Sequence, residues 1–138
     1  MKLEITEVED ANIPTLCLNM IVKNESKVIT RLLESVSPII DTYCICDTGS
    51  TDDTKEIITK FFSEKNIPGK IVEEPFKDFA HNRSHAIRSC TGMSDYVILL
   101  DADMILKIGE FDKKLLSQAD SFCLLQGSEE FYYQNMRI

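Results

Sequence analysis

The sequence predicts an α/β fold built on a mostly parallel sheet with helices on both faces. Short apolar runs typical of buried strands alternate along the chain with segments whose apolar residues recur at helical spacing. The segments between them contain proline, glycine or clustered acidic residues, which end one element before the next begins. Because 138 residues are enough for one hydrophobic core, we expect a single domain over residues 1–138.

The strands are expected where apolar residues follow one another without a polar interruption. In chain order these segments are Leu16–Val22, Thr42–Cys46, Lys70–Glu73 and Tyr96–Leu100, then two late strands around Phe122–Leu125 and Glu130–Arg137.

The helices are expected where apolar residues fall on one face of a 3.6-residue period. They are Glu25–Val36, a helix after the turn-rich segment Asp47–Thr54, Phe79–Cys90, and a short helix over Asp112–Gln118. The residues expected to face the core are Ile57, Ile58, Phe61 and Phe62 in the second helix, and Phe79, Ala86, Ile87 and Cys90 in the third.

Composition excludes several classes of function. With 15 basic and 23 acidic residues the net charge is −8, and no Lys/Arg cluster is present, so a nucleic-acid partner is not expected. No apolar run approaches the roughly 20 residues of a membrane span, and the N-terminus is too acidic for a signal peptide. The odd count of 5 cysteines without regular spacing favours free thiols and a reducing, cytoplasmic compartment.

Four acidic residues lie at or just beyond the predicted strand ends. They are Glu25, Asp47, Asp101 and Asp103. Ligands of open parallel sheets bind outside the carboxyl ends of the strands. This coincidence is the first indication of a binding site.

Asp101 and Asp103 directly follow the apolar run Tyr96–Leu100. Two carboxylates two residues apart repel each other unless a cation lies between them. Such hard oxygen ligands suit Mg²⁺ or Mn²⁺, which can bridge to a diphosphate while keeping several waters. The alternative is a strand-ending turn with solvated acids.

Asp47 ends the second predicted strand and precedes a Gly-Ser-Thr turn. A carboxylate there can accept the N–H of a nucleobase, whereas the alternative is a role in the turn alone. Ser50, Thr51, Asp52 and Asp53 resemble a capping box, so we assign them mainly to the N-terminus of the following helix.

Arg83 is a candidate diphosphate ligand, because its charge could offset what a single divalent ion leaves uncompensated. The alternative is a surface arginine. His81 and His85 lie one helical turn apart, but no third zinc ligand is evident, so we interpret both as polar-face residues.

Taken together, four segments resemble glycosyltransferase family 2, which has the GT-A (Rossmann-like) fold. They are Met20-Ile-Val-Lys-Asn-Glu25, Cys46-Asp-Thr-Gly-Ser-Thr-Asp-Asp-Thr54, Asp78-Phe-Ala-His-Asn-Arg83 and Leu100-Asp-Ala-Asp103, in the family's order across about residues 15–106. Asn82, Ser84 and Met104 depart from the residues that the closest subgroup usually has there.

The resemblance implies a nucleotide-sugar donor, with UDP-sugars favoured because the family uses them most often. Glu25 would contact the nucleoside, Asp47 the base and Arg83 the diphosphate. Asp101 would approach the ribose and the metal (Mn or Mg), and Asp103 would ligate the metal directly. An acceptor hydroxyl would attack the anomeric carbon with inversion.

The family's catalytic base normally lies well beyond the Asp-x-Asp motif. Few residues follow Asp103, and we recognise no base among them, so the catalytic residue and the acceptor stay unknown. We expect a truncated GT-A domain, the N-terminal part of a longer glycosyltransferase. The alternatives are a non-enzymatic nucleotide-binding module and a haloacid-dehalogenase-like phosphatase, which uses an Asp-x-Asp nucleophile after a strand.

Overall fold

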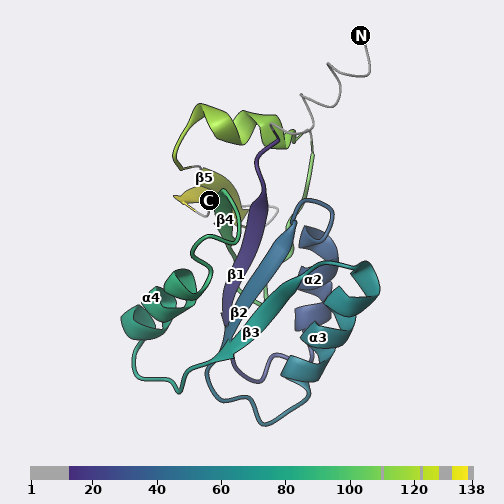
Figure 1. Ribbon diagram of the computed structural model, residues 1–138, viewed down its shortest axis with the longest axis vertical. Coiled ribbons are helices and arrows are strands. Elements are labelled where there is room, and N and C mark those ends of the chain that lie inside the picture. Colours follow the sequence, from purple (N-terminus) through teal and green to yellow (C-terminus); the bar gives the residue numbers. More distant parts are fainter. Residues whose placement is uncertain (1–12, 110, 122, 128–131, 137–138) are drawn as a thin grey trace.

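Four parallel strands form the central sheet of the protein, in the order β3-β2-β1-β4 (Figure 1). The structure is a computed structural model that describes residues 13–109, 111–121, 123–127 and 132–136. The strands of the sheet are β1 (Leu16–Val22), β2 (Thr42–Asp47), β3 (Gly69–Glu73) and β4 (Tyr96–Leu99). A separate antiparallel pair consists of β5 (Cys123–Gly127) and β6 (Tyr132–Met136). The predicted α/β class and the mostly parallel sheet are confirmed.

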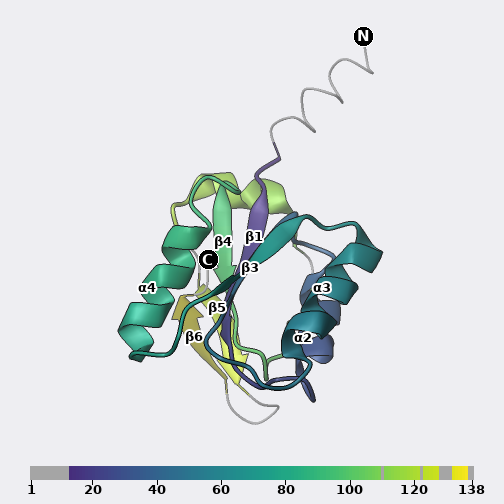
Figure 2. The same cartoon turned by 60° about the horizontal axis from the view of Figure 1, so that its bottom comes forward.

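Helices cover both faces of this sheet, as the sequence predicts. Helices α2 (Ile29–Val36) and α3 (Thr54–Lys65) lie against one face, and α4 (Phe79–Ser89) lies against the other (Figures 1 and 2). A 3₁₀ helix, η1 (Lys113–Gln118), follows β4. Within the described ranges, no helix combines the length and the apolar character that crossing a bilayer requires.

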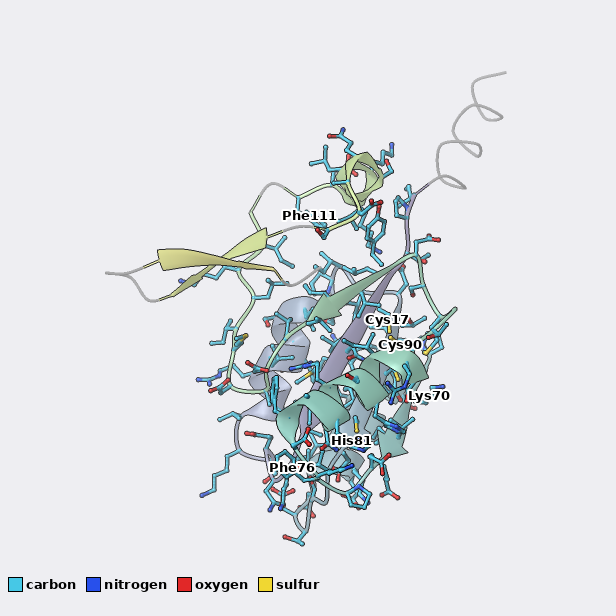
Figure 3. The ribbon with its side chains drawn as sticks, turned by 90° about the vertical axis from the view of Figure 1, so that its left-hand side faces the viewer. Cys17, Lys70, Phe76, His81, Cys90 and Phe111 are labelled. Atoms are coloured by element: carbon cyan, nitrogen blue, oxygen red, sulfur yellow. The ribbon has the colours of Figure 1, made fainter. Side chains whose placement is uncertain are left out.

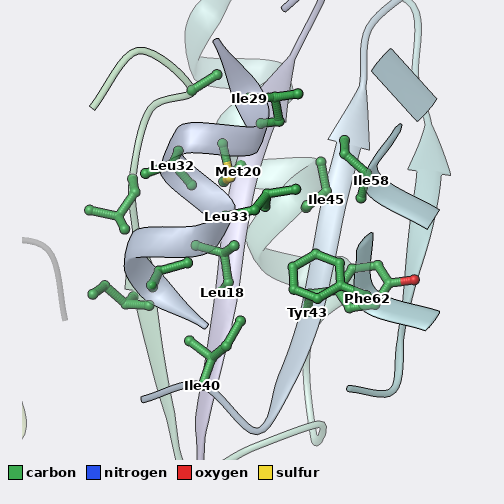
Figure 4. Close-up of a cluster of buried hydrophobic side chains, with 14 of the residues drawn as sticks. Leu18, Met20, Ile29, Leu32, Leu33, Ile40, Tyr43, Ile45, Ile58 and Phe62 are labelled. Atoms are coloured by element: carbon green, nitrogen blue, oxygen red, sulfur yellow. The ribbon is translucent and has the colours of Figure 1, made fainter. Parts of the chain in front are cut away.

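The larger core lies between the sheet and helices α2 and α3. Alternate residues of β1 point to opposite faces, so Leu18 and Met20 join this core while Cys17 lies on the other side. The rings of Tyr43 and Phe62 stack with centroids 4.0 Å apart at an interplanar angle of 13°, which fixes α3 on β2 (Figure 4).

A smaller cluster packs beneath α4. It contains the buried thiols of Cys17, Cys44 and Cys90, and Cys17 and Cys90 lie close together near the C-terminal end of the helix (Figure 3). The amide of buried Asn19 donates to the carbonyls of Cys44 (3.0 Å) and Ala86 (2.9 Å). The first bond holds the Asn19 side chain to β2, and the second ties α4 to it. Asn19 of β1 therefore helps to fix where α4 lies on the sheet.

The structure corrects two details of the sequence interpretation. Helix α2 begins at Ile29 and not at Glu25. In α4, Phe79 and Ile87 are not inward: they are 67% and 41% exposed. The buried face of α4 contains Asn82 instead. The side chain of Asn82 accepts from the Lys77 N–H (3.0 Å) and donates to nearby carbonyls. A polar residue thus takes an inward position that apolar periodicity would not assign to it.

Candidate functional site

The sequence-predicted site residues lie around the carboxyl ends of the strands. Glu25 lies in the loop after β1, Asp47 is the last residue of β2, and Asp101 and Asp103 follow β4. Arg83 reaches this edge from α4, where its guanidinium nitrogen Nη2 is 3.5 Å from Asp101 Oδ1. The parallel topology brings the residues together, because the adjacent strands β2, β1 and β4 end at the same edge.

Asp47 is buried, with 2% of its surface exposed. Its Oδ1 accepts the N–H groups of Gly49 (2.9 Å) and Ser50 (2.8 Å). Its Oδ2 is buried without a hydrogen bond to the described residues. A buried acceptor left in this state costs roughly 1–3 kcal/mol, so this oxygen is suited to a donor supplied by a ligand.

The hydrogen bonds around Asp47 keep it ionised. Burial alone would raise the pKa of this carboxyl, but hydrogen bonds from the Ser50 hydroxyl and from the N–H groups of Ser50 and Gly49, together with the charge of Lys55, lower it below its ordinary value. Near neutral pH the carboxylate therefore accepts hydrogen bonds and does not donate them.

Arg83 is a positive charge that faces Asp101. Its side chain is 16% exposed, and its guanidinium carbon lies 5.5 Å from the centre of the Phe79 ring. The Asp101 side chain is 47% exposed, so one side of this ion pair faces solvent. An arginine held between an aromatic ring and a carboxylate is oriented before a ligand arrives.

Carboxylates outnumber cations at this edge. Burial raises the pKa of Glu25, and the negative charges of Asp103, Asp52 and Asp101 raise it further. The carboxylates that act on Glu25 therefore come from more than one loop. This excess of negative charge favours a bound cation.

The donor set fits a divalent metal that shares its coordination with a ligand. Within the described ranges, no three His, Cys, Asp or Glu side chains form a group that would hold a metal by themselves. Mg²⁺ and similar hard ions are often held by one or two carboxylates together with phosphate oxygens and water. Asp101 and Asp103, with hard oxygens and accessible positions, suit that arrangement.

The loop after β2 differs from the predicted capping box. Asp53 is the N-cap residue of α3, but its side chain makes no capping hydrogen bond. The Ser50 hydroxyl accepts the N–H of Asn24 (2.9 Å) in place of a helix N–H. It is Asp52 that accepts the N–H of Thr54 (3.0 Å), the first residue of the helix. The predicted capping box between Ser50 and Asp53 is therefore wrong, although Asp53 does occupy the N-cap position and Asp52 does bond to the helix N-terminus.

The sequence profile of glycosyl transferase family 2 matches residues 17–123, which is most of the chain. The chain belongs to this family. Membership agrees with the family predicted from the four motifs, and it decides against a haloacid-dehalogenase-like phosphatase.

Similar proteins are much longer than this chain. The SPbeta prophage-derived glycosyltransferase SunS of Bacillus subtilis is 35% identical over 95 residues, which are 69% of this chain and 21% of SunS. A TPR repeat-containing protein of Synechococcus elongatus is 36% identical over 104 residues, which are 75% of this chain and 24% of that protein. The chain thus spans less than a quarter of the length of these two relatives.

Solved structures share the fold. The mannosyltransferase PcManGT of Pyrobaculum calidifontis, in complex with GDP-Man and Mn²⁺, matches with a TM-score of 0.60 at 22% identity, over 69% of this chain and 29% of that one. The glucosyl-3-phosphoglycerate synthase of Mycobacterium tuberculosis, with Mn²⁺, UDP and phosphoglyceric acid, matches with a TM-score of 0.50 at 26% identity, over 73% and 37%. The predicted GT-A fold is confirmed, and this family 2 domain is shorter than the chains of both solved structures.

Sequence reasoning missed two residues at this edge. Asn24 bonds the loop after β1 to the loop after β2 through its side chain. Glu74, just beyond β3, donates its N–H to the Asp47 carbonyl (3.1 Å), and its Oε2 lies 3.2 Å from His85 Nδ1 and 3.7 Å from His81 Nε2. Only the position of Glu74 after a strand could have drawn attention to it.

Proposed function

We propose that this family 2 domain is the donor-binding part of a glycosyltransferase and binds a nucleoside-diphosphate sugar together with a divalent metal. The observation that carries the proposal is the meeting of one arginine and several carboxylates at the carboxyl edge of the sheet. Arg83 contacts Asp101, and Glu25 lies within the field of Asp101 and Asp103. The solved relatives with a nucleotide and Mn²⁺ support the same class of ligand.

Asp47 is proposed to recognise the base. Its ionised carboxylate accepts hydrogen bonds only, and the buried Oδ2 needs a donor. Uracil offers N3–H and guanine offers N1–H, whereas the ring nitrogen N3 of cytosine is itself an acceptor. This chemistry favours UDP or GDP over CDP, and we favour a UDP-sugar within that pair because the family uses it most often.

The remaining residues are proposed to bind the rest of the donor. Glu25 lies beside the nucleoside and Asp101 beside the ribose and the metal, with Asp103 as the direct metal ligand. Arg83 donates hydrogen bonds to the diphosphate, and its positive charge offsets the negative charge of that leaving group. A divalent ion held by Asp101 and Asp103 would stabilise negative charge on that diphosphate.

In the proposed reaction an acceptor hydroxyl attacks the anomeric carbon with inversion, while a carboxylate removes its proton. The described acids after Asp103 are Asp112 and Asp120, whereas Glu129 and Glu130 lie outside the described residues. Asp112 lies with Asp41 and Thr15 at the amino edge of the sheet, and Asp120 follows Ala119, whose carbonyl accepts from the hydroxyl of Tyr96 at the start of β4.

Both acids therefore lie at the opposite end of the strands from Asp101. Figure 3 places Phe111, next to Asp112, far from Phe76 and His81 at the carboxyl edge. We propose that residues 1–138 bind the donor but transfer sugar poorly alone, with slow hydrolysis of the donor. The acceptor and its base are assigned to a longer parent protein.

The buried free thiols of four cysteines support a reducing, cytoplasmic compartment.

Calorimetry with UDP, GDP and CDP, each with Mn²⁺ and with excess chelator, tests the binding proposal. We expect UDP or GDP to bind in the presence of metal and CDP to bind more weakly. Equal UDP affinity with and without metal would refute the metal site. An assay of sugar transfer and donor hydrolysis by the same chain separates two cases. An incomplete enzyme hydrolyses the donor, whereas a pure nucleotide-binding module neither transfers the sugar nor hydrolyses the donor.

A further inference from the structure

Asn24 makes several of the hydrogen bonds that join two loops at the carboxyl edge. Asn24, in the loop after β1, accepts with Oδ1 from the N–H of Thr51 (2.7 Å) and from the N–H of Asp52 (3.3 Å). Its own N–H donates to the Ser50 hydroxyl oxygen (2.9 Å). The partners of Asn24 are thus three consecutive residues of the loop after β2, and this loop directly follows Asp47.

The backbone conformation of Asn24 is one that few residue types adopt, and it suits this role. Its φ is +53°, in the left-handed region. Outside glycine, asparagine and aspartate are the residues that adopt this region most readily. The conformation lets both the N–H and the side chain of one residue reach the same neighbouring loop, so the position selects for a short side chain with an acceptor.

The bonds of Asn24 continue to Asp47. Ser50, which accepts from Asn24, donates its own N–H to Asp47 Oδ1 (2.8 Å). Gly49 donates the second N–H to the same oxygen (2.9 Å), and its φ of +128° requires glycine. The orientation of the Asp47 carboxylate therefore depends on a tight turn whose far side is held by Asn24.

We propose that Asn24 is a positioning residue for base recognition, which holds the turn after β2 so that Asp47 Oδ2 is presented to the nucleobase. The inference rests on the proposed nucleotide site and adds to it a residue with no direct contact to the ligand. Without the Asn24 side chain, the N–H groups of Thr51 and Asp52 lose their acceptor and the turn loosens. The carboxylate of Asp47 then rotates more freely, and discrimination between bases is lost before the fold is.

Three substitutions test this inference. Asn24→Gly keeps the left-handed backbone and removes the acceptor. Asn24→Asp keeps both the backbone preference and an acceptor oxygen. Asn66→Gly is the matched control, because Asn66 is an exposed asparagine with a similar φ of +57° at the far end of α3.

Calorimetry with UDP and CDP in the presence of Mn²⁺ gives the ratio of their affinities for each variant, and amide hydrogen exchange reports on the Thr51 N–H. In Asn24→Gly we expect UDP to bind about tenfold more weakly, with the UDP:CDP ratio moving toward one and Thr51 exchanging faster. In Asn24→Asp the added charge weakens both diphosphates alike, so the ratio and the protection of Thr51 return toward wild type. Asn66→Gly should keep the wild-type ratio.

The outcomes separate the inference from the function it rests on. If the wild-type chain binds neither nucleotide, the proposed function fails and the inference fails with it. If the wild type binds UDP and Asn24→Gly keeps the same UDP:CDP ratio, only the role of Asn24 is refuted, even where its melting temperature falls. A purely structural residue would lower the folded fraction and leave the ratio of the folded protein unchanged.

Discussion

Replacing Asp47 by asparagine should shift the base preference of the site from UDP toward CDP. Asp47 Oδ1 accepts two N–H groups at 2.8 and 2.9 Å, so in Asp47→Asn the amide oxygen must occupy this position. The amide NH₂ then takes the place of Oδ2, and a buried acceptor becomes a buried donor. Uracil would meet it with N3–H, a donor facing a donor, whereas cytosine would meet it with the N3 acceptor.

The size of the effect follows from the charge of the bond. A hydrogen bond to a charged group contributes about 1.5–3 kcal/mol and a neutral bond about 0.5–1.5 kcal/mol. At about 1.4 kcal/mol for each factor of ten, UDP should lose about 10- to 100-fold in affinity and CDP should gain a few-fold. The UDP:CDP ratio should therefore fall by at least about twentyfold.

Calorimetry of the folded variant with both nucleotides and Mn²⁺ measures this ratio. Asp53→Asn is the control: it makes the same change of charge at an exposed residue whose side chain caps nothing, and its ratio should match that of the wild type. An equal loss for UDP and CDP in Asp47→Asn would refute base recognition by this carboxylate and leave it a structural part of the turn.

Three further predictions concern the rest of the edge. Asp103→Ala should abolish the gain in UDP affinity that Mn²⁺ gives, measured against the same titration with chelator. Arg83→Ala should weaken UDP by about 10- to 100-fold, as expected for charge-assisted bonds of about 1.5–3 kcal/mol, and should affect uridine far less; equal losses would make Arg83 structural. The hydrogen bond from the Thr54 hydroxyl, with others from Ser26, lowers the pKa of Asp52 to about 2 from its ordinary value of 3.8. The stability that the ionised Asp52 contributes to the fold is thus complete above pH 3.8 and is lost as the pH falls toward 2. Between these pH values the stability of Asp52→Ala should therefore depend less steeply on pH than that of the wild type, as measured by unfolding at each pH.

The arrangement of strands and helices could be predicted because each element repeats a simple pattern. The residues of β1 alternate between two faces, and the apolar stripe of α2 matches one of them. Parallel connectivity then requires the strand ends to share an edge, which is why the sequence alone was enough to assign Asp47 and Asp101 to one site. Their roles toward a nucleotide stay predictions.

The orientation of α4 could not be predicted in the same way. Apolar spacing assigned Phe79 to the core, yet Asn82 is buried in its place. Burial of Asn82 depends on acceptors and donors in residues 74–77, a segment whose path no local pattern describes. A buried polar side chain is stable only where its partners are in place, and those partners come from tertiary structure.

Within a motif, the sequence does not distinguish a side chain that binds a ligand from one that holds its neighbour. The stretch ending in Asn24-Glu25 and the turn from Asp47 to Thr54 both belong to the segments that resemble the family, and the sequence favoured a capping role for the latter. The two stretches in fact bond to each other, through Asn24 to Thr51 and through the Glu25 N–H to the Thr54 hydroxyl (2.9 Å). Each stretch therefore supports the conformation of the other through hydrogen bonds that cross between the loops. The pair therefore acts as one structural unit, and a substitution in either loop should be judged by its effect on Asp47.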